Sequence, residues 1–260
     1  MQLICLNARH PFAVRIGSGV GSEHYLAVQQ GEDGSFRRLV MIKKLSSLLR
    51  DAARTEMMRE VKAAANLSHP NVVRVIGAER SGGHLLISME YIRGYGLGEL
   101  LDGLKAAGAQ VPLGVFMRLL FQACEAIDYA QRAVDMVGNP LGLVHRNISP
   151  ESIKVDEEGY LRVIDFGLSK FAKSEDATLP GQIKGTLGYM PLEQMRGHPL
   201  DVRSDIFSLA MTFYEVYTLQ SPRDALNIKA AFDEAAEMSC VGPLTDYRSC
   251  PESLEAVFAK

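Results

Sequence analysis

The chain has little net charge and few cysteines, and each of these absences excludes a class of protein. Its 28 Lys and Arg against 31 Asp and Glu give a net charge of −3. Without a long basic block, there is no electrostatic signature of nucleic-acid binding. The four cysteines lack metal-type spacing and predict reduced thiols rather than a disulfide framework. They are Cys5, Cys124, Cys240 and Cys250.

Long apolar runs are also missing. No stretch reaches the ~18 apolar residues that a membrane-spanning helix needs, and the start, MQLICLNARHPF, has too short an apolar run for a secretory signal. We therefore expect a cytoplasmic protein without a membrane segment. What remains is typical of globular chains: 260 residues, 47% hydrophobic and 23% charged. This length suits one large domain or two packed lobes.

The chain is organised around residues 143–168, LVHRNISPESIKVDEEGYLRVIDFGL. Two short apolar runs, 153–155 and 161–164, flank a Glu-Glu-Gly turn and predict a β-hairpin. The hairpin presents two polar loops. One loop carries His145, Arg146, Asn147 and Ser152, and the other carries Asp165, Phe166 and Gly167.

In sequence and spacing these loops closely resemble the catalytic loop and the metal-binding loop of protein kinases. The resemblance covers roughly residues 12–222. It implies a two-lobed α+β fold, with a small antiparallel sheet and one helix in residues 1–92. A larger, mainly helical lobe is expected in residues 93–260, ending before the family's pattern is complete. The insert 132–142 and the Ser149-Pro150 pair further resemble bacterial kinases of the myxobacterial sort.

A glycine-rich turn lies near the start of the chain, where the strand-like runs 12–16 and 24–28 enclose Gly17, Gly19 and Gly21. An ordinary hairpin also fits, because glycine supplies positive φ in any tight turn, whereas a dinucleotide-binding turn would open a helix. By the resemblance, this hairpin covers the phosphates of ATP. The match is imperfect, because Ser22 stands at the third glycine position and His24 replaces a valine that packs on adenine.

The strand 38–44 aligns Lys43 with the family's lysine that holds the α- and β-phosphates. The alternative is a solvated lysine at a strand end. Met41 stands at an alanine position over adenine, and overfilling a packed site costs ~1–3 kcal/mol, although methionine can move aside. On the helix predicted over 54–67, Glu60 stands where the family places the lysine's partner. We expect a Lys43–Glu60 ion pair rather than a solvated surface glutamate.

The hinge between the lobes follows the predicted strands 72–76 and 85–89, with Met89 as the gatekeeper residue. By the resemblance, backbone groups of Glu90 and Ile92 contact adenine, and Gly96 stands where many relatives carry a ribose-binding acid. In the larger lobe, the apolar stripe of 113–133 predicts a core helix. Asp205 opens another helix, and in the family this aspartate holds the backbone of the catalytic loop.

The segment 169–190 resembles the activation loop. Ser174 and Thr178 are candidate phosphorylation sites, and Arg146 would bind the added phosphate. Alternatively, both are solvated loop hydroxyls. Pro191-Leu192-Glu193 stands in place of the family's Ala-Pro-Glu motif. The arginine that usually pairs with this glutamate would lie beyond residue 260, unless Glu193 has another partner. Further helices are expected over 228–238 and from 251.

Two replacements weaken the predicted chemistry. Asn147 stands in place of the family's catalytic aspartate, and a carboxamide is a very poor base, whereas a general base contributes ~10²–10⁴-fold. Ser152 stands in place of the second magnesium-binding residue, while Asp165 keeps the other metal ligand. His145 takes the structural role that it has in the family, packing against Phe166.

We therefore predict a pseudokinase, a regulatory or scaffolding module that binds a protein partner or client kinase. It binds ATP and Mg²⁺ if the pocket is functional. The alternative is a weak Ser/Thr kinase that transfers the ATP γ-phosphate to a protein hydroxyl, which the intact Lys43, Glu60 and Asp165 support. A third reading is that Asn147 is an engineered replacement of aspartate.

Overall fold

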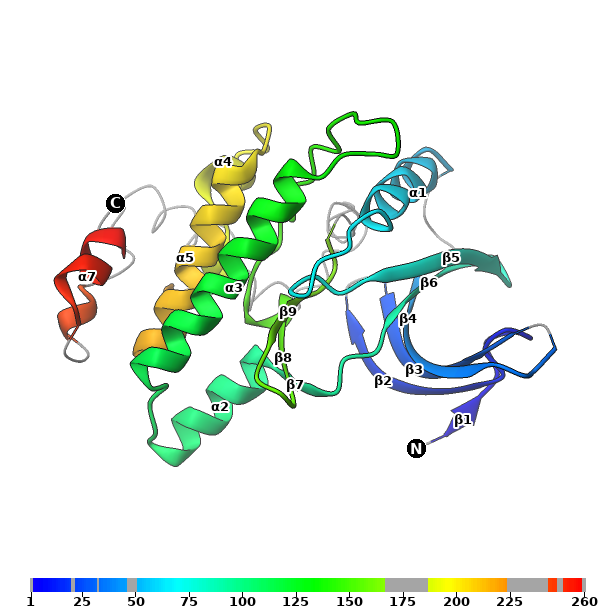
Figure 1. The fold of residues 1–260 in the computed structure, drawn as a ribbon, viewed down its shortest axis with the longest axis horizontal. Helices are drawn as coiled ribbons and strands as arrows, with labels where there is room; N and C mark the ends of the chain where they lie inside the picture. Colours follow the sequence, from blue (N-terminus) through cyan, green and yellow to red (C-terminus); the bar gives the residue numbers. More distant parts are fainter. Residues whose placement is uncertain are drawn as a thin grey trace.

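The computed structural model describes residues 2–19, 22–31, 33–45, 51–166, 187–223, 243–246 and 250–258. Figure 1 shows two parts, a curved sheet with one helix on its face and a larger part built mainly from helices. The two-lobed α+β architecture predicted from the sequence is confirmed.

The smaller lobe is a six-stranded antiparallel sheet in the order β1-β2-β3-β4-β6-β5. Its strands are β1 (Leu3–Ile4), β2 (Phe12–Gly19), β3 (Ser22–Gln30), β4 (Arg37–Leu45), β5 (Val75–Ser81) and β6 (His84–Glu90). Alternation of buried and less buried residues marks the strands, as in β3, where Tyr25, Ala27 and Gln29 are buried. One face of β3 therefore packs inward, whereas β6 is buried on both faces from Leu85 to Met89.

Helix α1 (Asp51–Ala64) covers one face of this sheet (Figure 1). Met57, Val61 and Ala64 recur at helical spacing and join a buried cluster with Ile87 and Met89 of β6. A second apolar cluster lies on the opposite face, where Ile4 and Leu6 of the N-terminal segment pack against it. Its buried members are Ala13, Tyr25, Ala27, Val40, Ile42 and Leu86.

The larger lobe holds a second sheet and most of the helices. The strands are β7 (Gly94–Gly96), β8 (Ile153–Asp156) and β9 (Leu161–Val163). The helices are α2 (Leu97–Ala107), α3 (Leu113–Arg132), α4 (Leu192–Met195), α5 (Val202–Thr218) and α7 (Glu252–Phe258), with 3₁₀ turns at Pro150–Ser152, Leu187–Tyr189 and Leu244–Asp246. The β8–β9 hairpin and the core helix predicted at 113–133 are confirmed.

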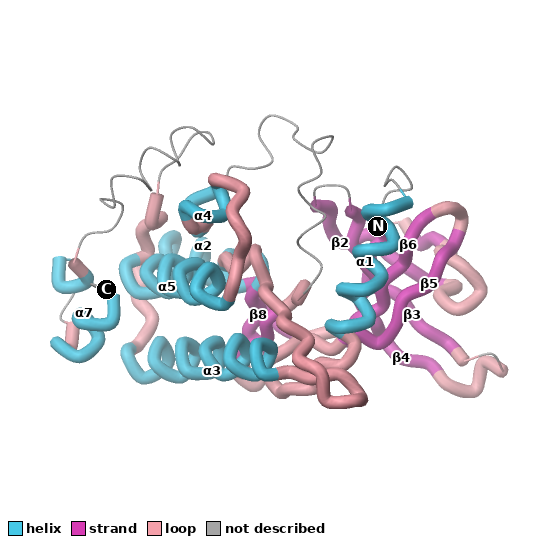
Figure 2. Tube along the Cα trace, turned by 90° about the horizontal axis from the view of Figure 1, so that it is seen from above, coloured by secondary structure: helices cyan, strands magenta, loops and turns pink. Residues whose placement is uncertain are grey.

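Helices α3 and α5 lie side by side and support the hairpin (Figure 2). Phe116 of α3 packs edge-on against Phe213 and Tyr217 of α5, with ring centroids 5.7 and 5.1 Å apart. Gln122 of α3 accepts a hydrogen bond of 2.8 Å from the backbone N–H of Leu161 in β9. Through Gln122, α3 therefore holds β9 of the hairpin that presents the two loops.

The strand predicted at 72–76 begins later, at Val75. The preceding residues pair with the other lobe: Val73 donates its backbone N–H to the carbonyl of Val163, and Val163 donates to that of Asn71, both at 2.8 Å. The boundary moves because these backbone groups are satisfied by β9 rather than by β6. The segment is thus one of the links between the lobes.

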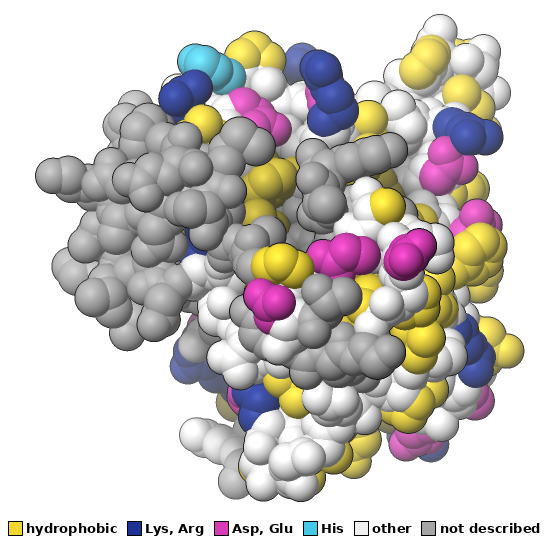
Figure 3. Space-filling view, turned by 90° about the vertical axis from the view of Figure 1, so that its left-hand side faces the viewer, with side chains coloured by type: hydrophobic (Ala, Val, Ile, Leu, Met, Phe, Trp, Pro, Cys, Tyr) yellow, Lys and Arg dark blue, Asp and Glu magenta, His cyan; other side chains and the backbone are white. Residues whose placement is uncertain are grey.

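Some predictions fall on residues outside those described, namely Gly21, Gly167, Ser174, Thr178, Cys240 and the helix at 228–238. None of the described helices is long and apolar enough to cross a lipid bilayer. Figure 3 views the end of the larger lobe, where acidic, basic and hydrophobic side chains are interspersed over the described surface.

Candidate active site

The catalytic loop, residues 143–152, is held by Asp205 in the first turn of α5. Asp205 is 2% exposed and accepts hydrogen bonds from the backbone N–H groups of His145, at 2.7 Å, and Arg146, at 2.8 Å. Burial raises the pKa of Asp205, although His145 and these N–H groups oppose the shift. The contact is the one expected of Asp205 from the sequence.

His145 ties the two loops together. Its ring is fully buried and packs edge-on against Phe166, with centroids 4.7 Å apart. The ring Nε2 lies 2.7 Å from the carbonyl oxygen of Ile164, and Nδ1 lies 3.3 Å from the backbone N–H of Asn147. This pattern fits donation from Nε2 and acceptance at Nδ1. The geometry supports the structural role predicted for His145.

Asn147 and Ser152 differ in how their side chains are used. Within the described residues, Asn147 is bonded through its backbone N–H, to His145, and its carboxamide has no hydrogen-bond partner. The Ser152 hydroxyl, in contrast, donates to the carbonyl of Ser149 at 2.9 Å and accepts from the N–H of Ser149 at 3.0 Å. Ser152 is 4% exposed, so its oxygen closes the 3₁₀ turn instead of facing the pocket.

Lys43 and Glu60 do not pair with each other. Lys43 of β4 lies 2.7 Å from Oδ2 of Asp165, measured from Nζ. Glu60 of α1 pairs with Arg146, with 2.9 Å between Oε1 and Nη1. The predicted Lys43–Glu60 ion pair is therefore wrong. The sequence offers the lysine two carboxylates, and the packing of α1 relative to the loop after β9 decides which of them it contacts.

Asp165 is an ionised carboxylate held by this lysine. Burial alone would raise the pKa of Asp165, but the charge of Lys43 and its hydrogen bond outweigh burial, so the pKa is lowered. Asp165 and Arg146 both have left-handed backbones, with φ of 65° and 66°. Such φ values are uncommon outside glycine and cluster at functional sites.

The described residues do not fit a site for two magnesium ions. Asp165 supplies one carboxylate, whereas the Ser152 oxygen is used within its own turn. Across the described ranges, no group of three or more His, Cys, Asp or Glu side chains could hold a metal ion. Of the two predicted metal positions, Asp165 and Ser152, Asp165 keeps the chemistry of a magnesium ligand.

The pocket between the lobes is narrow. It has a cavity volume of about 40 Å³ and is lined by His24, Met41, Val73, Met89, Glu90, Ile92, Lys154, Ile164 and Asp165. Ligand sites usually span ~300–1,000 Å³, so the cavity among the described residues is much smaller than a typical ligand site. Met41 and His24, which depart from the family's pattern, are both in the lining. The sequence analysis did not predict Lys154 as a pocket residue, because no sequence pattern distinguishes this lysine near the start of a strand from a solvated one.

Of the other predicted nucleotide-binding positions, Glu90 and Ile92 line this pocket, whereas Gly17 and Gly19 are not among its described lining residues. Strand β2 runs through Gly17 to Gly19 and pairs with β3, which gives the predicted strand-glycine-strand hairpin. A Cβ at Gly17 would meet no atom within 4 Å, so packing does not require glycine there. Glu90 and Ile92 line the pocket at the end of β6, where the hinge was predicted.

Two further contacts are made by side chains of α4. Glu193 accepts a hydrogen bond of 2.6 Å from the hydroxyl of Ser204, so this glutamate has a partner among the described residues. Gln194 donates from Nε2 to the carbonyl of Arg146 at 2.8 Å. No sequence pattern indicated the Gln194 contact, which joins α4 to the catalytic loop.

His24 introduces a titratable group beside the ion pair. Its position in β3 is directly across from Lys43 in β4, and its Nε2 lies 3.3 Å from the hydroxyl of Ser22. Burial, followed by the charge of Lys43, lowers the pKa of His24, while Asp165 opposes the shift. His24 is therefore neutral at neutral pH.

We expect the folded protein to lose stability as the pH falls below about 6.5, the ordinary imidazole pKa. The unfolded chain takes up the proton first, because the folded pKa of His24 is the lower one. Burial lowers the pKa of His10 and His69 as well, so they act in the same direction. His24→Val should reduce the fall in melting temperature between about pH 7.5 and 5.5. An unchanged fall in melting temperature in His24→Val would contradict this assignment. The control is His198→Gln, at an exposed position, which should leave the fall as it is in the unmodified protein.

Comparison with known proteins identifies the family to which this arrangement belongs. A lobe of antiparallel strands and a helical lobe, with a lysine and an aspartate meeting between them, define a fold of the protein-kinase type. The family described as "Protein kinase domain" matches residues 12–252. The chain belongs to this family.

Its relatives are bacterial kinases of the eukaryotic type. The chain is 33% identical over 250 residues to the tyrosine-protein kinase MasK of Myxococcus xanthus, covering 95% of this chain and 38% of that protein. It is 31% identical over 224 residues to the serine/threonine-protein kinase PknB of Mycobacterium leprae, covering 84% of this chain and 33% of that protein. The chain thus spans less than two fifths of these relatives' length. The PknI kinase domain of Mycobacterium tuberculosis has the same fold, with a TM-score of 0.70, 24% identity and coverage of 99% of this chain and 89% of that one.

Proposed function

We propose that this chain is a pseudokinase, a kinase-fold module that has lost, or nearly lost, phosphoryl transfer. It acts in cytoplasmic signalling as a regulatory or scaffolding unit that engages a protein partner or client kinase. The observation that carries the proposal is the catalytic loop itself. Asn147 presents a carboxamide where a proton acceptor is needed, and the Ser152 hydroxyl is bonded within its own turn.

The ion pairs around the pocket support the same conclusion. Lys43 is paired with Asp165, so the group that would hold phosphates and the group that would hold magnesium neutralise each other. Glu60 is paired with Arg146 instead of supporting Lys43. Phosphoryl transfer depends mainly on positioned charges. In this arrangement those charges are directed at one another.

The experiment that tests the nucleotide side of the proposal is the melting temperature with and without millimolar ATP and magnesium. Ligand at 100 times its dissociation constant adds ~2.7 kcal/mol, or about 5–10 °C for a domain of this size. With a cavity of about 40 Å³, we expect a rise of under about 2 °C. The double variant His24→Val with Met41→Ala should show the larger rise, because both side chains line the pocket.

A matched control for this measurement is Met117→Ala, since Met117 is an exposed methionine of α3. It should leave the response to ATP unchanged. A rise of about 5–10 °C in the unmodified chain would show a working nucleotide pocket. The module would then be a nucleotide-binding pseudokinase or a weak kinase, which an assay of phosphate transfer separates.

The second candidate function is a weak Ser/Thr kinase. It is favoured by the lowered pKa of Asp165, which keeps a charged carboxylate in place, and by the Asp205 contacts that hold the catalytic loop. Transfer of radiolabelled γ-phosphate to a generic protein substrate tests it directly. Transfer that disappears in Asp165→Asn would establish this candidate, because it requires the remaining metal ligand.

A further inference from the structure

A second and larger pocket lies on the outer face of the sheet, away from α1. Its cavity volume is about 300 Å³, and it is bounded by the N-terminal segment, the β3–β4 hairpin and strands β5 and β6. Arg9, Arg38, Phe36, Glu79 and Ser88 are among its lining residues. The volume is at the lower end of the range of small-molecule sites.

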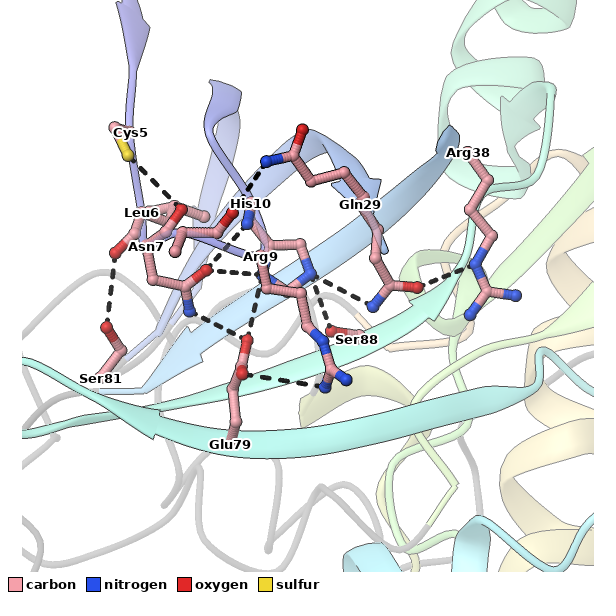
Figure 4. Close-up of polar contacts among 12 residues, drawn as sticks. Cys5, Leu6, Asn7, Arg9, His10, Gln29, Arg38, Glu79, Ser81 and Ser88 are labelled. Carbon is pink, nitrogen blue, oxygen red and sulfur yellow. Dashed lines mark hydrogen bonds and ion pairs between the residues drawn. The ribbon is translucent and has the colours of Figure 1, made fainter. Parts of the chain in front are cut away.

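The wall and floor of this pocket are unusually polar for the packed face of a sheet. Figure 4 shows a chain of hydrogen bonds that runs through the buried ring of His10. Arg38 donates from Nε to Oε1 of Gln29 at 2.8 Å, and Nε2 of Gln29 lies 3.3 Å from Nε2 of His10. Nδ1 of His10 lies 3.1 Å from Oε1 of Glu79, whose Oε2 is 4.0 Å from Arg9.

These bonds determine which atoms of Gln29 and His10 donate and which accept. Because Oε1 of Gln29 accepts from Arg38, its amide nitrogen must donate to Nε2 of His10, and the ring proton is on Nδ1, facing Glu79. Asn7 closes the arrangement by donating to the same carboxylate oxygen at 2.9 Å. The side chains of His10, Gln29 and Ser88 are at most 9% exposed. The network is therefore a rigid support beneath the two arginines.

The charges that face the pocket favour an anion. Arg9 and Arg38 are positive, Glu79 is negative, and burial keeps His10 neutral by lowering its pKa. Glu79 is occupied by Asn7, His10 and Arg9. Among the described residues, Arg38 makes no hydrogen bond or ion pair through its two terminal nitrogens, and the Ser88 hydroxyl has one long contact, 3.5 Å to His10. Among the described residues that line this pocket, hydrogen-bond donors without a partner therefore outnumber acceptors without a partner.

We propose that this pocket binds a small anion through a carboxylate or phosphate group. The guanidinium of Arg38 would hold the anion by its two terminal nitrogens, a planar fork that matches both groups. Arg9 closes the open side, and Ser88 donates from the floor. The exposed ring of Phe36, over which Arg38 lies at 5.6 Å, covers the apolar part of the ligand.

The test is an isothermal titration of the full chain with inorganic phosphate and, separately, with succinate, both at constant ionic strength. We expect saturable binding of at least one probe. Arg38→Gln should weaken it by about tenfold or more, as expected for the loss of a charge-assisted hydrogen-bond pair. Arg37→Gln is the matched control, because the neighbouring residue of a strand faces the other side of the sheet. Its binding should match that of the unmodified chain.

The probe that binds more tightly identifies the anionic group. Absence of saturation with both probes would overturn the proposal, as would an equal loss in Arg37→Gln, which would indicate general attraction of anions. If Arg38→Gln fails to fold, Arg9→Gln, altered at a 58% exposed side chain, gives the same comparison. Sedimentation of the unmodified chain serves as the last check. A dimer that Arg38→Gln dissociates, without phosphate or succinate binding, would assign the pocket to a second copy of the chain and refute the small-anion site.

Discussion

Replacing Asp205 with alanine is expected to lower the free energy of unfolding by about 2–6 kcal/mol, because two backbone N–H groups would lose their acceptor at ~1–3 kcal/mol each. The aspartate is 2% exposed, so water cannot easily replace the lost carboxylate. Urea unfolding at constant m-value measures the change. This is the largest stability effect that we expect from a single substitution in the active-site region.

The matched control is Asp128→Ala on the surface of α3. Asp128 pairs with Arg132 at 2.8 Å, but the two side chains are 48% and 77% exposed, so this loss should cost no more than about 0.5 kcal/mol. A change within about 1 kcal/mol of the unmodified protein in Asp205→Ala would contradict the assigned role. The catalytic loop would then be held by contacts other than those of Asp205.

The second large effect concerns phosphate transfer. Restoring only the catalytic loop, with Asn147→Asp and Ser152→Asn, should produce little transfer, because Met41 and His24 still narrow the pocket. Adding Met41→Ala and His24→Val should raise transfer to a generic protein substrate by about 10²-fold or more. General-base catalysis alone contributes ~10²–10⁴-fold, and the opened pocket allows it to act.

The control variants distinguish the effect of the catalytic-loop residues on phosphate transfer from the effect of the narrow pocket. Met41→Ala with His24→Val in the unmodified catalytic loop should bind ATP without gaining comparable transfer, because Asn147 still lacks a proton-accepting carboxylate. Strong transfer from the two loop substitutions alone would refute the view that the pocket has diverged. It would favour a recent or engineered loss of the aspartate. Strong transfer by the unmodified chain would refute the pseudokinase proposal itself.

The catalytic loop illustrates what sequence could predict about the site. The order His145-Arg146-Asn147 and the spacing to Asp165 identified both loops, and the hairpin between them formed where the apolar runs predicted it. Such elements depend on neighbours in the chain, and their side-chain pattern is local. The helix of Asp205 was likewise anticipated, together with its contact to the catalytic loop.

The pairing of charges could not be predicted in the same way. Lys43, Glu60, Arg146 and Asp165 come from four separated elements, and the sequence is compatible with more than one pairing among them. Their relative positions depend on how α1 and the two loops pack, and a shift of a few ångströms changes which pair is in contact. The Lys43–Glu60 prediction failed for this reason, although both residues were correctly placed on β4 and α1.

Local sequence by itself identified the class of the protein, the two-lobed fold, and Asn147 and Ser152 at positions where the family has catalytic and metal-binding residues. The tertiary structure decided the rest: the partners of Lys43 and Glu60, the closure of the Ser152 hydroxyl into its own turn, the narrowness of the nucleotide pocket and the second pocket above His10. The physical reason is the sequence separation of the residues that interact. Hydrogen-bonded elements are specified by residues a few positions apart, whereas cavities and ion pairs arise where distant elements pack together.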